Sequence, residues 1–356
     1  MEGKNICFIT QKFDHNDPFR ANVIEWIRIL SNSKKIKKLH ILTRSKNYSS
    51  CDFNNCSISS IYSRNKIISL FYFYREIFKH SEKNSIIFIH QGGPYAINLI
   101  IFKILFGVKV FQWKAHPVIG PLTFLGFKFV VDKLFTCTNN SFPIKSSKKL
   151  VIGHGIDLKR FPIRKSFHVK KEKKLVTTSR ISSRKNIHEM ILLVKKINEY
   201  YPEEVSLTIF GQPMTKRDNL YLEYLNHLIL CQNLSKTVEI KEPIAHKELH
   251  KELSKYNIYL NFSETALDKA VLEAMSIGLP ILSNNECLRE SLTNSELKES
   301  MLFQKNEDEN KIIEKLTNIL NFDNKNYEYY SSLLSAFVKN NHSIESLVRN
   351  IEKNIF

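Results

Sequence analysis

Short apolar runs alternate with amphipathic segments through the first half of the chain. The runs occupy residues 6–10, 39–43, 86–90, 108–113 and 133–138. Between the first two, residues 19–31 repeat apolar side chains at helical spacing, with Val23, Ile24, Ile27 and Leu30 on one face. This alternation predicts a parallel sheet covered by helices.

The same pattern restarts after Pro162 and a charged stretch. The predicted strands of this second series are residues 175–178, 206–210, 238–240, 258–262 and 280–283. Residues 326–356 contain no strand signal and are predicted to be helical. We therefore expect an α/β fold with a Rossmann-like domain at 1–164, a second one at 165–335, and a helical tail at 336–356 that packs back on the first domain.

Two doubly wound domains imply a cleft in which a ligand meets the carboxyl ends of the strands and helix N-termini. The most apolar stretch, residues 96–113, is interrupted by Lys103, Gly107 and Lys109, so it predicts a buried helix followed by a strand rather than a membrane span. The N-terminal apolar run is too short for a signal peptide, and it predicts a first strand.

The chain has 356 residues, of which 43% are hydrophobic and 25% charged, which excludes a disordered or fibrous protein. Its six cysteines are scattered and only Cys51 and Cys56 lie close, which favours reduced thiols in a cytoplasmic protein over a metal site. The net charge of +18 fits either a solvated basic surface or a polyanionic partner such as nucleic acid, anionic lipid or a phosphorylated substrate.

Four segments of the second half, in this order, resemble the family 4-like glycosyltransferases of GT-B fold. They are VIGHGIDLKRF (151–161), TTSRISSRKNIHEMI (177–191), LTIFGQP (207–213) and SETALDKAVLEAMSIGLPILSN (263–284). The stretch 241–263 also resembles the family, whereas the N-terminal half does so only loosely. The resemblance implies a GT-B fold, with two Rossmann-like domains facing across a cleft, and transfer of a sugar from a nucleotide donor.

Arg180 and Lys185 follow a predicted strand and precede a predicted helix. A leaving nucleoside diphosphate gains negative charge as the sugar bond breaks, and preorganised cations stabilise it. The resemblance assigns this role to Arg180 and Lys185. Without the neighbouring segments, the two residues would be interpreted as solvated cations.

Glu273 lies in a short predicted helix ended by Gly278. Placed in its first turn, the carboxylate is stabilised by the helix dipole, and the resemblance implies that it accepts hydrogen bonds from a ribose diol. A helix-capping carboxylate without a ligand is the alternative.

The family usually has a second glutamate eight residues earlier, where this chain has Thr265, with Glu264 one residue out of register. The segment looks like a variant in which threonine and an Asp-Lys pair replace the usual start. The donor-side residues implied by this segment are Glu264, Thr265, Ala266, Leu267, Asp268, Lys269 and Leu272. Asp268 and Lys269 are expected to set the loop.

Gly155 and Gly211 are expected to admit a ligand close to the backbone. The family usually has asparagine before the first of these glycines, where this chain has His154. In the first half, the resemblance implies that His116 reaches the donor sugar, with a structural histidine as the alternative. His90, at the end of a predicted strand, is a weaker candidate for substrate contact.

The first loop lacks the Gly-Gly pair of many relatives. Its polar residues Asp14, His15, Asp17 and Arg20 are candidates for the acceptor side by location alone.

The resemblance implies a retaining, metal-independent hexosyltransferase, and we expect it to act in bacterial surface polysaccharide or glycolipid synthesis, with no cofactor. The sequence has no DxD pattern to hold a metal. Its partners would be a nucleotide sugar, a saccharide or lipid-linked acceptor and an anionic membrane surface, at the inner face of the cell membrane. The alternatives are a sugar-nucleotide epimerase of the same fold and a non-catalytic binder of sugar nucleotides or polyanions; no nucleic-acid motif favours the last.

Overall fold

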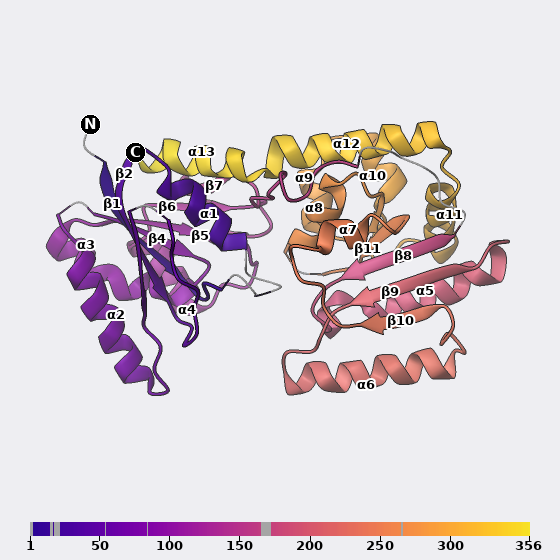
Figure 1. Cartoon of the computed structure of the whole chain (residues 1–356), viewed down its shortest axis with the longest axis horizontal. Helices are drawn as coiled ribbons and strands as arrows, with labels where there is room; N and C mark the ends of the chain where they lie inside the picture. The colour runs from indigo at the N-terminus through magenta and orange to yellow at the C-terminus, as the bar shows by residue number, and fades with distance from the viewer. Residues whose placement is uncertain are drawn as a thin grey trace. The chain divides into compact units, whose positions relative to one another are not determined.

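The computed structural model describes residues 3–14, 17, 22–53, 55–83, 85–164, 172–264 and 266–356. The chain divides into two units, which are coloured along the chain in Figure 1. The first consists of Met1–Gly155 and His342–Phe356, and the second of Ile156–Asn341. The chain thus changes unit after residue 155, nine residues before the predicted boundary, and returns at residue 342, six residues after the predicted start of the tail.

The first unit contains a seven-stranded parallel sheet in the order β3-β2-β1-β4-β5-β6-β7. Its strands are β1 (Lys4–Thr10), β2 (Ile36–Thr43), β3 (Cys56–Ser60), β4 (Ile86–His90), β5 (Lys109–Trp113), β6 (Lys133–Thr136) and β7 (Lys149–Val151). Its helices are α1 (Asn22–Ser31), α2 (Lys66–His80), α3 (Ile100–Phe106), α4 (Pro121–Phe129) and α13 (Ile344–Ile355), with 3₁₀ turns η1 (Gly93–Tyr95) and η2 (Ile97–Leu99).

One face of this sheet is covered by α2, α3 and α4, which bury Phe73, Phe102 and Phe127 in a common core with Ile9 and Ile89 of the strands. Helix α13 packs against α1, so the end of the chain belongs to the N-terminal unit. Strands β3 and β7 were not predicted. Both are short strands at edges of the sheet. Because few of their side chains are buried, the sequence shows no long apolar run there.

The second unit contains a five-stranded parallel sheet in the order β10-β9-β8-β11-β12. Its strands are β8 (Lys173–Thr178), β9 (Val205–Phe210), β10 (Val238–Lys241), β11 (Ile258–Asn261) and β12 (Ile281–Ser283). Its helices are α5 (Ile187–Tyr200), α6 (Lys216–Cys231), α7 (Leu249–Leu253), α8 (Lys269–Ser276), α9 (Glu286–Ser291), α10 (Ser295–Met301), α11 (Glu309–Leu320) and α12 (Asn324–His342), with η3 at Ser183–Lys185. All five strands predicted in this half are present.

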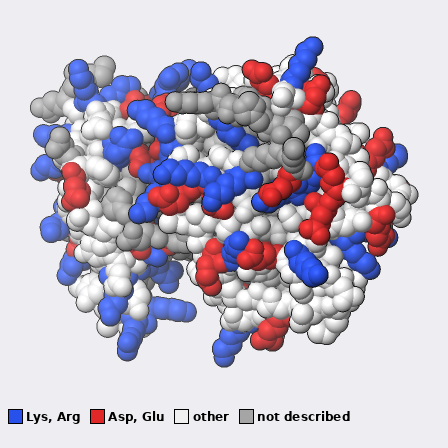
Figure 2. Space-filling model, turned by 45° about the vertical axis from the view of Figure 1, so that its right-hand side comes forward, with Lys and Arg blue, Asp and Glu red and all other residues white. Residues whose placement is uncertain are grey.

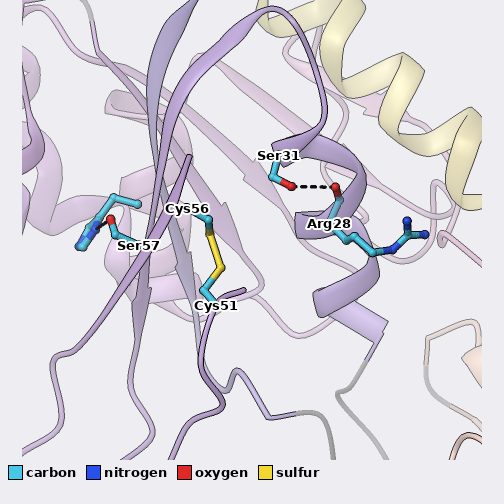
Figure 3. The surroundings of a disulfide bond; sticks show 6 residues. Arg28, Ser31, Cys51, Cys56 and Ser57 are labelled. Atoms are coloured by element: carbon cyan, nitrogen blue, oxygen red, sulfur yellow. Dashed lines mark hydrogen bonds between the residues drawn. A yellow bond between two sulfur atoms is a disulfide. The ribbon is translucent and has the colours of Figure 1, made fainter. Parts of the chain in front are cut away.

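Two predictions about the first unit were wrong. Helix α3 was expected to be buried, but within it only Phe102 is buried, while Ile104 and Leu105 are 76% and 68% exposed. Six reduced thiols were also expected, whereas Cys51 and Cys56 form a disulfide with a Cα–Cα distance of 6.3 Å (Figure 3). The cysteines therefore give no support to a cytoplasmic location.

The charge of the chain is unequally divided. The first unit contains 25 Lys and Arg against 10 Asp and Glu, and the second 28 against 25. Figure 2 shows one face of the molecule, over which basic side chains protrude throughout while acidic side chains are concentrated on part of it. Among the helices of the described residues, none is long and apolar enough to cross a membrane.

Candidate donor site

In the sheet of the second unit, the strand order changes direction between β8 and β11. Strands β9 and β10 follow β8 on one side, and β12 follows β11 on the other. In open α/β sheets such a switch point is where loops at the carboxyl ends of the strands separate and leave room for a ligand. The loop after β8 contains Arg180 and Lys185, and the loop after β11 leads to the start of α8 at Lys269. The topology therefore places both predicted motifs at one end of one sheet.

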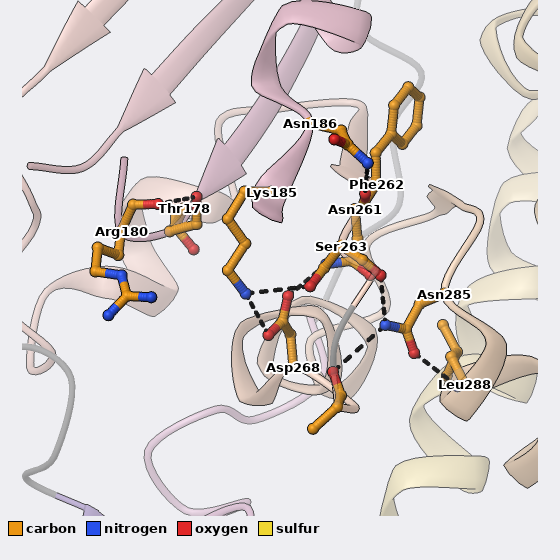
Figure 4. A network of polar contacts seen from close by, with 12 residues as sticks. Thr178, Arg180, Lys185, Asn186, Asn261, Phe262, Ser263, Asp268, Asn285 and Leu288 are labelled. Atoms are coloured by element: carbon orange, nitrogen blue, oxygen red, sulfur yellow. Dashed lines mark hydrogen bonds and ion pairs between the residues drawn. The ribbon is translucent and has the colours of Figure 1, made fainter. Parts of the chain in front are cut away.

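Lys185 joins these two loops. Its Nζ lies 2.6 Å from Oδ1 of Asp268 and 3.3 Å from Oγ of Ser263 (Figure 4). The other carboxylate oxygen of Asp268 accepts from Nδ2 of Asn261 at 2.9 Å. Asn186, left-handed at φ +47°, follows Lys185 and donates to the carbonyl of Phe262, which fixes the turn. The Asp268 side chain thus pairs with Lys185 from the β8 loop, whereas its neighbour Lys269 takes a different partner.

Arg180 lies in the same loop and is half-buried. Figure 4 shows its guanidinium apart from the Lys185–Asp268 pair. Its Nε is buried and has no hydrogen-bond partner among the described residues. Burial alone would raise the pKa of Asp218, but hydrogen bonds from Thr215 and the Met214 amide, together with the Arg180 charge, lower it. Arg180 therefore offers a partly desolvated cation at the switch point.

Glu273 is buried in α8, at 3% exposure, and forms the centre of a charged cluster. Its Oε1 lies 2.6 Å from Nζ of Lys269 and 2.7 Å from Nε2 of His246. On the other side of the imidazole, NH1 of Arg160 donates to Nδ1 at 2.9 Å, which fixes the tautomer with Nε2 as the donor to Glu273. Burial alone would raise the pKa of Glu273, but the Lys269 charge and the His246 hydrogen bond lower it to about 2.

This cluster leaves Glu273 ionised and one oxygen available. Both contacts fall on Oε1, and the structure pairs Oε2 with none of the described residues. The pKa of His246 is lowered, first by burial and then by the Lys269 charge. The expectation that Glu273 lies in the first turn of its helix was wrong: α8 begins at Lys269, which puts Glu273 in the second turn.

The remaining donor-side candidates lie around the start of α8. Ala266 and Leu267 are buried, and the carbonyl of Ala266 accepts from Nδ2 of Asn285 at 3.4 Å. The Leu272 side chain is fully buried. Glu264 is paired with Lys305, and its side chain is 43% exposed. Thr265 lies outside the described residues.

Gly211 allows the loop after β9 to pack against the loop after β8. A Cβ built on it would lie 2.0 Å from the carbonyl oxygen of Ser179, in the segment that leads to Arg180. The amides of Ser179 and Ile181 donate to Phe210 and Gln212, on either side of the glycine. The close approach at Gly211 is therefore that of the β8 loop.

Two candidates of the first unit, His90 and Gly155, lie at an aromatic cluster that contains Trp26. His90, at the end of β4, stacks on Trp113 with centroids 5.2 Å apart and meets Trp26 edge-on at 5.1 Å. Gly155 has φ +79°, and a Cβ there would lie 2.5 Å from Nε1 of Trp26. In the loop after β5, Nδ1 of His116 accepts from the amide of Val118 at 3.2 Å.

In the first loop, Lys12 bridges Asp14 at 3.2 Å and Asp17 at 2.7 Å. His15 and Arg20 lie outside the described residues. The first loop thus brings together two of its four acceptor-side candidates.

A metal cluster was not predicted, but His40, Glu76 and His80 place three ligand atoms within 4.8 Å of one another. Each Nε2 lies 3.8 Å from Oε2 of Glu76. The two imidazoles are stacked 3.4 Å apart at 15°, so their in-plane lone pairs run nearly parallel and do not converge on one ion. Binding one ion through both rings would require one of them to rotate.

His246 and Arg160 were not recognised from the sequence. Both lie inside segments that resemble the family. However, His246 is 27 residues from Glu273 in the sequence and Arg160 is 86 residues from His246, and no spacing rule predicts contacts over such separations. All three residues belong to the second unit, whose fold brings them together from three separate segments of the chain.

Comparison with known proteins finds a family that matches most of the second unit. The family described as Glycosyl transferases group 1 matches residues 159–332, which include Arg160, Arg180, Lys185, His246 and Glu273. We call the matched region, residues 159–332, the group 1 domain after the family that it resembles. A search of curated proteins finds no match to the chain.

Several solved structures are similar to this protein over nearly its whole length, including the first unit. HepE of Anabaena, solved with UDP-glucose, is 11% identical with a TM-score of 0.75, and 99% of each chain is covered. Sucrose-phosphate synthase of Thermosynechococcus elongatus is 15% identical with a TM-score of 0.76, covering 99% of this chain and 98% of the other. A glycosyltransferase of Rickettsia africae is 13% identical with a TM-score of 0.74, covering 100% and 98%. The chain has the GT-B fold.

Proposed function

We propose that the protein transfers a sugar from a nucleoside diphosphate sugar to an acceptor hydroxyl, with the donor held by the group 1 domain. The observation that supports this most is the Lys185–Asp268 pair, which ties the cationic β8 loop to the start of α8. Asp268 gives Lys185 an anion in the position that a donor phosphate would take. HepE, of the same fold, is solved with UDP-glucose, which supports a nucleotide sugar as the donor class.

In this proposal the diphosphate lies against Arg180, Lys185 and the amides at the N-terminus of α8. Helix N-termini and cations both favour a group of developing negative charge. Glu273 accepts from the ribose diol through Oε2, since its Oε1 is held by Lys269 and His246. The Lys269 charge and the His246 hydrogen bond keep that carboxylate ionised and fixed.

The leaving diphosphate is proposed to accept the acceptor proton, with retention of anomeric configuration, and His116 of the first unit to reach the donor sugar. Cations and the helix N-terminus take the place of a metal ion in this scheme. The acceptor is proposed to be a saccharide or a lipid-linked saccharide at the cytoplasmic face of the membrane, in polysaccharide or glycolipid synthesis.

The first test is a thermal-shift screen against UDP, GDP, ADP and CMP sugars, because a ligand that binds only the folded protein raises its melting temperature. One nucleotide class should raise it by several degrees, undiminished by EDTA. If no nucleotide sugar shifts the melting temperature, the donor assignment is wrong.

The donor that the screen selects then separates transfer from epimerisation. Incubated with enzyme alone it should remain unchanged, and with a sugar acceptor it should release the nucleoside diphosphate. An epimer formed from the donor alone would instead support the isomerase.

A further inference from the structure

The helices α2, α3 and α4 expose large apolar side chains to solvent. The six most exposed are Ile67, Phe71 and Phe78 in α2, Ile104 and Leu105 in α3, and Phe129 in α4, each between 55% and 78% exposed. We call these six residues the apolar face. Single exposed apolar residues are ordinary in soluble proteins, but a contiguous group marks an interaction site.

The three helices form one layer, so their exposed residues share one surface. Phe78 of α2 meets Phe106 of α3 edge-on with centroids 5.9 Å apart, and Tyr74 stacks on Phe102 at 6.0 Å. Helix α4 packs on the 3₁₀ turns that lead directly into α3. In Figure 1 α2 and α3 lie beside the strands of the N-terminal unit, while α4 overlaps the strands in this view.

Helix α2 is apolar on opposite sides, which the sheet alone does not require. Phe73 and Ile77 face the core, while Ile67, Phe71 and Phe78 recur at intervals of four and seven residues, which is one helical stripe, on the outside. A helix that only covers a sheet normally presents polar residues to water. The outer stripe therefore indicates a second apolar environment.

The charges around the apolar face are basic. Residues 83–131 contain no Asp or Glu, and exposed lysines flank the apolar residues in sequence: Lys66 before Ile67, Lys79 after Phe78 and Lys128 before Phe129. The carboxylates next to this surface are already engaged, Glu76 by Arg75 at 2.9 Å and Asp132 by Lys103 at 2.6 Å. The apolar face thus has a rim of positive charge.

We propose that the apolar face lies on a lipid bilayer that contains anionic lipid, with the apolar side chains in the acyl boundary and the lysines at the headgroups. A surface of exposed apolar side chains flanked by lysines matches an anionic interface, which offers both an apolar interior and negative charge. A second copy of the chain fits less well, because pairing this face with itself would bring together two units of 25 basic and 10 acidic residues each. The inference concerns the first unit and does not depend on the donor chemistry of the second.

Vesicle flotation tests the proposal with purified full-length protein. Wild-type protein should float with vesicles of phosphatidylcholine and phosphatidylglycerol and much less with phosphatidylcholine alone, and high salt should weaken the binding. The double variant Ile104→Asp, Leu105→Asp should bind at least tenfold more weakly. Both side chains are mostly exposed, so circular dichroism and the melting temperature should match the wild type.

The matched control is Leu220→Asp, Leu230→Asp, which changes two leucines that are each 66% exposed on α6 of the second unit. It should float like the wild type. The proposal is overturned if wild-type protein fails to bind anionic vesicles at low salt, or if the α3 variant and the control float equally. It is also overturned if sedimentation shows a wild-type dimer that the α3 variant dissociates while vesicle binding is unchanged, since the face would then bind a second copy.

Discussion

The two units share the spatial order of their first five strands, yet they differ in what they place at the point where that order reverses. Between β1 and β4 the first unit has a cluster of aromatic rings and imidazoles around Trp26, Trp113 and His90. Between β8 and β11 the second unit has paired and buried charges, centred on Lys185, Asp268 and Glu273. One scaffold therefore supports two chemistries, and only the charged one suits a diphosphate.

The two units also differ in the net charge of their sequences, and here the first unit is the more charged. The first unit has a large basic excess and exposes apolar helices, while the second is nearly neutral over its sequence. The unit with little net charge concentrates its charges in a site, and the unit with high net charge spreads them over a surface. Net charge alone would direct a search for the diphosphate site to the first unit, whereas the paired charges that we propose for it lie in the second.

The largest effect expected from this comparison is a loss of turnover in the Arg180→Ala variant. Losing one preorganised donor to a developing anion costs about two orders of magnitude in turnover, and Arg180 has a buried Nε without a partner among the described residues. The matched control is Arg184→Ala, an exposed arginine of the same turn, which should stay within a few-fold of wild type. Normal turnover by folded Arg180→Ala protein would refute the role of this cation.

Glu273→Gln should destabilise the second unit. The pKa of Glu273 is lowered from 4.5 to about 2 in the fold, so its ionised form contributes about 3 kcal/mol to the free energy of unfolding. Because the folded pKa is the lower one, this contribution is complete above about pH 4.5 and is lost as the pH falls toward 2. Urea unfolding of both proteins between pH 2 and 7 measures it, and a difference that is independent of pH would contradict the assignment.

Gly211→Ala should destabilise the protein by about 2 kcal/mol, the usual scale for a side chain forced into packed structure, because its Cβ would lie 2.0 Å from the Ser179 carbonyl. Displacing that segment should also weaken donor binding. Gly120→Ala is the control, since nothing lies within 4 Å of a Cβ there. Equal melting temperatures for the two variants would show that the β8 loop moves away from the added Cβ without loss of stability.

The smallest effect is expected for Glu264→Gln. This residue is a candidate for the carboxylate that the motif usually has before α8, but the structure pairs it with Lys305 on the surface. Donor affinity measured by calorimetry should therefore fall at most a few-fold. A hundredfold loss would mean that Glu264 leaves Lys305 and binds the donor.

The sequence predicted the central strands because each is a buried apolar run, but it could not predict contacts that depend on topology. Lys185 and Asp268 are 83 residues apart and meet only because β8 and β11 are neighbours in the sheet. His246 was missed for the same reason. The burial of α3 was predicted wrongly because its apolar composition does not reveal whether a helix faces the core or another apolar surface.

The most direct test of the central claim is the affinity of Lys185→Ala protein for the di- and monophosphate of the nucleotide that the wild type prefers, measured by calorimetry. The wild type should bind the diphosphate at least tenfold more tightly than the monophosphate, because Lys185 exchanges Asp268 for the terminal phosphate. In Lys185→Ala that preference should disappear. An unchanged preference for the diphosphate would contradict the account.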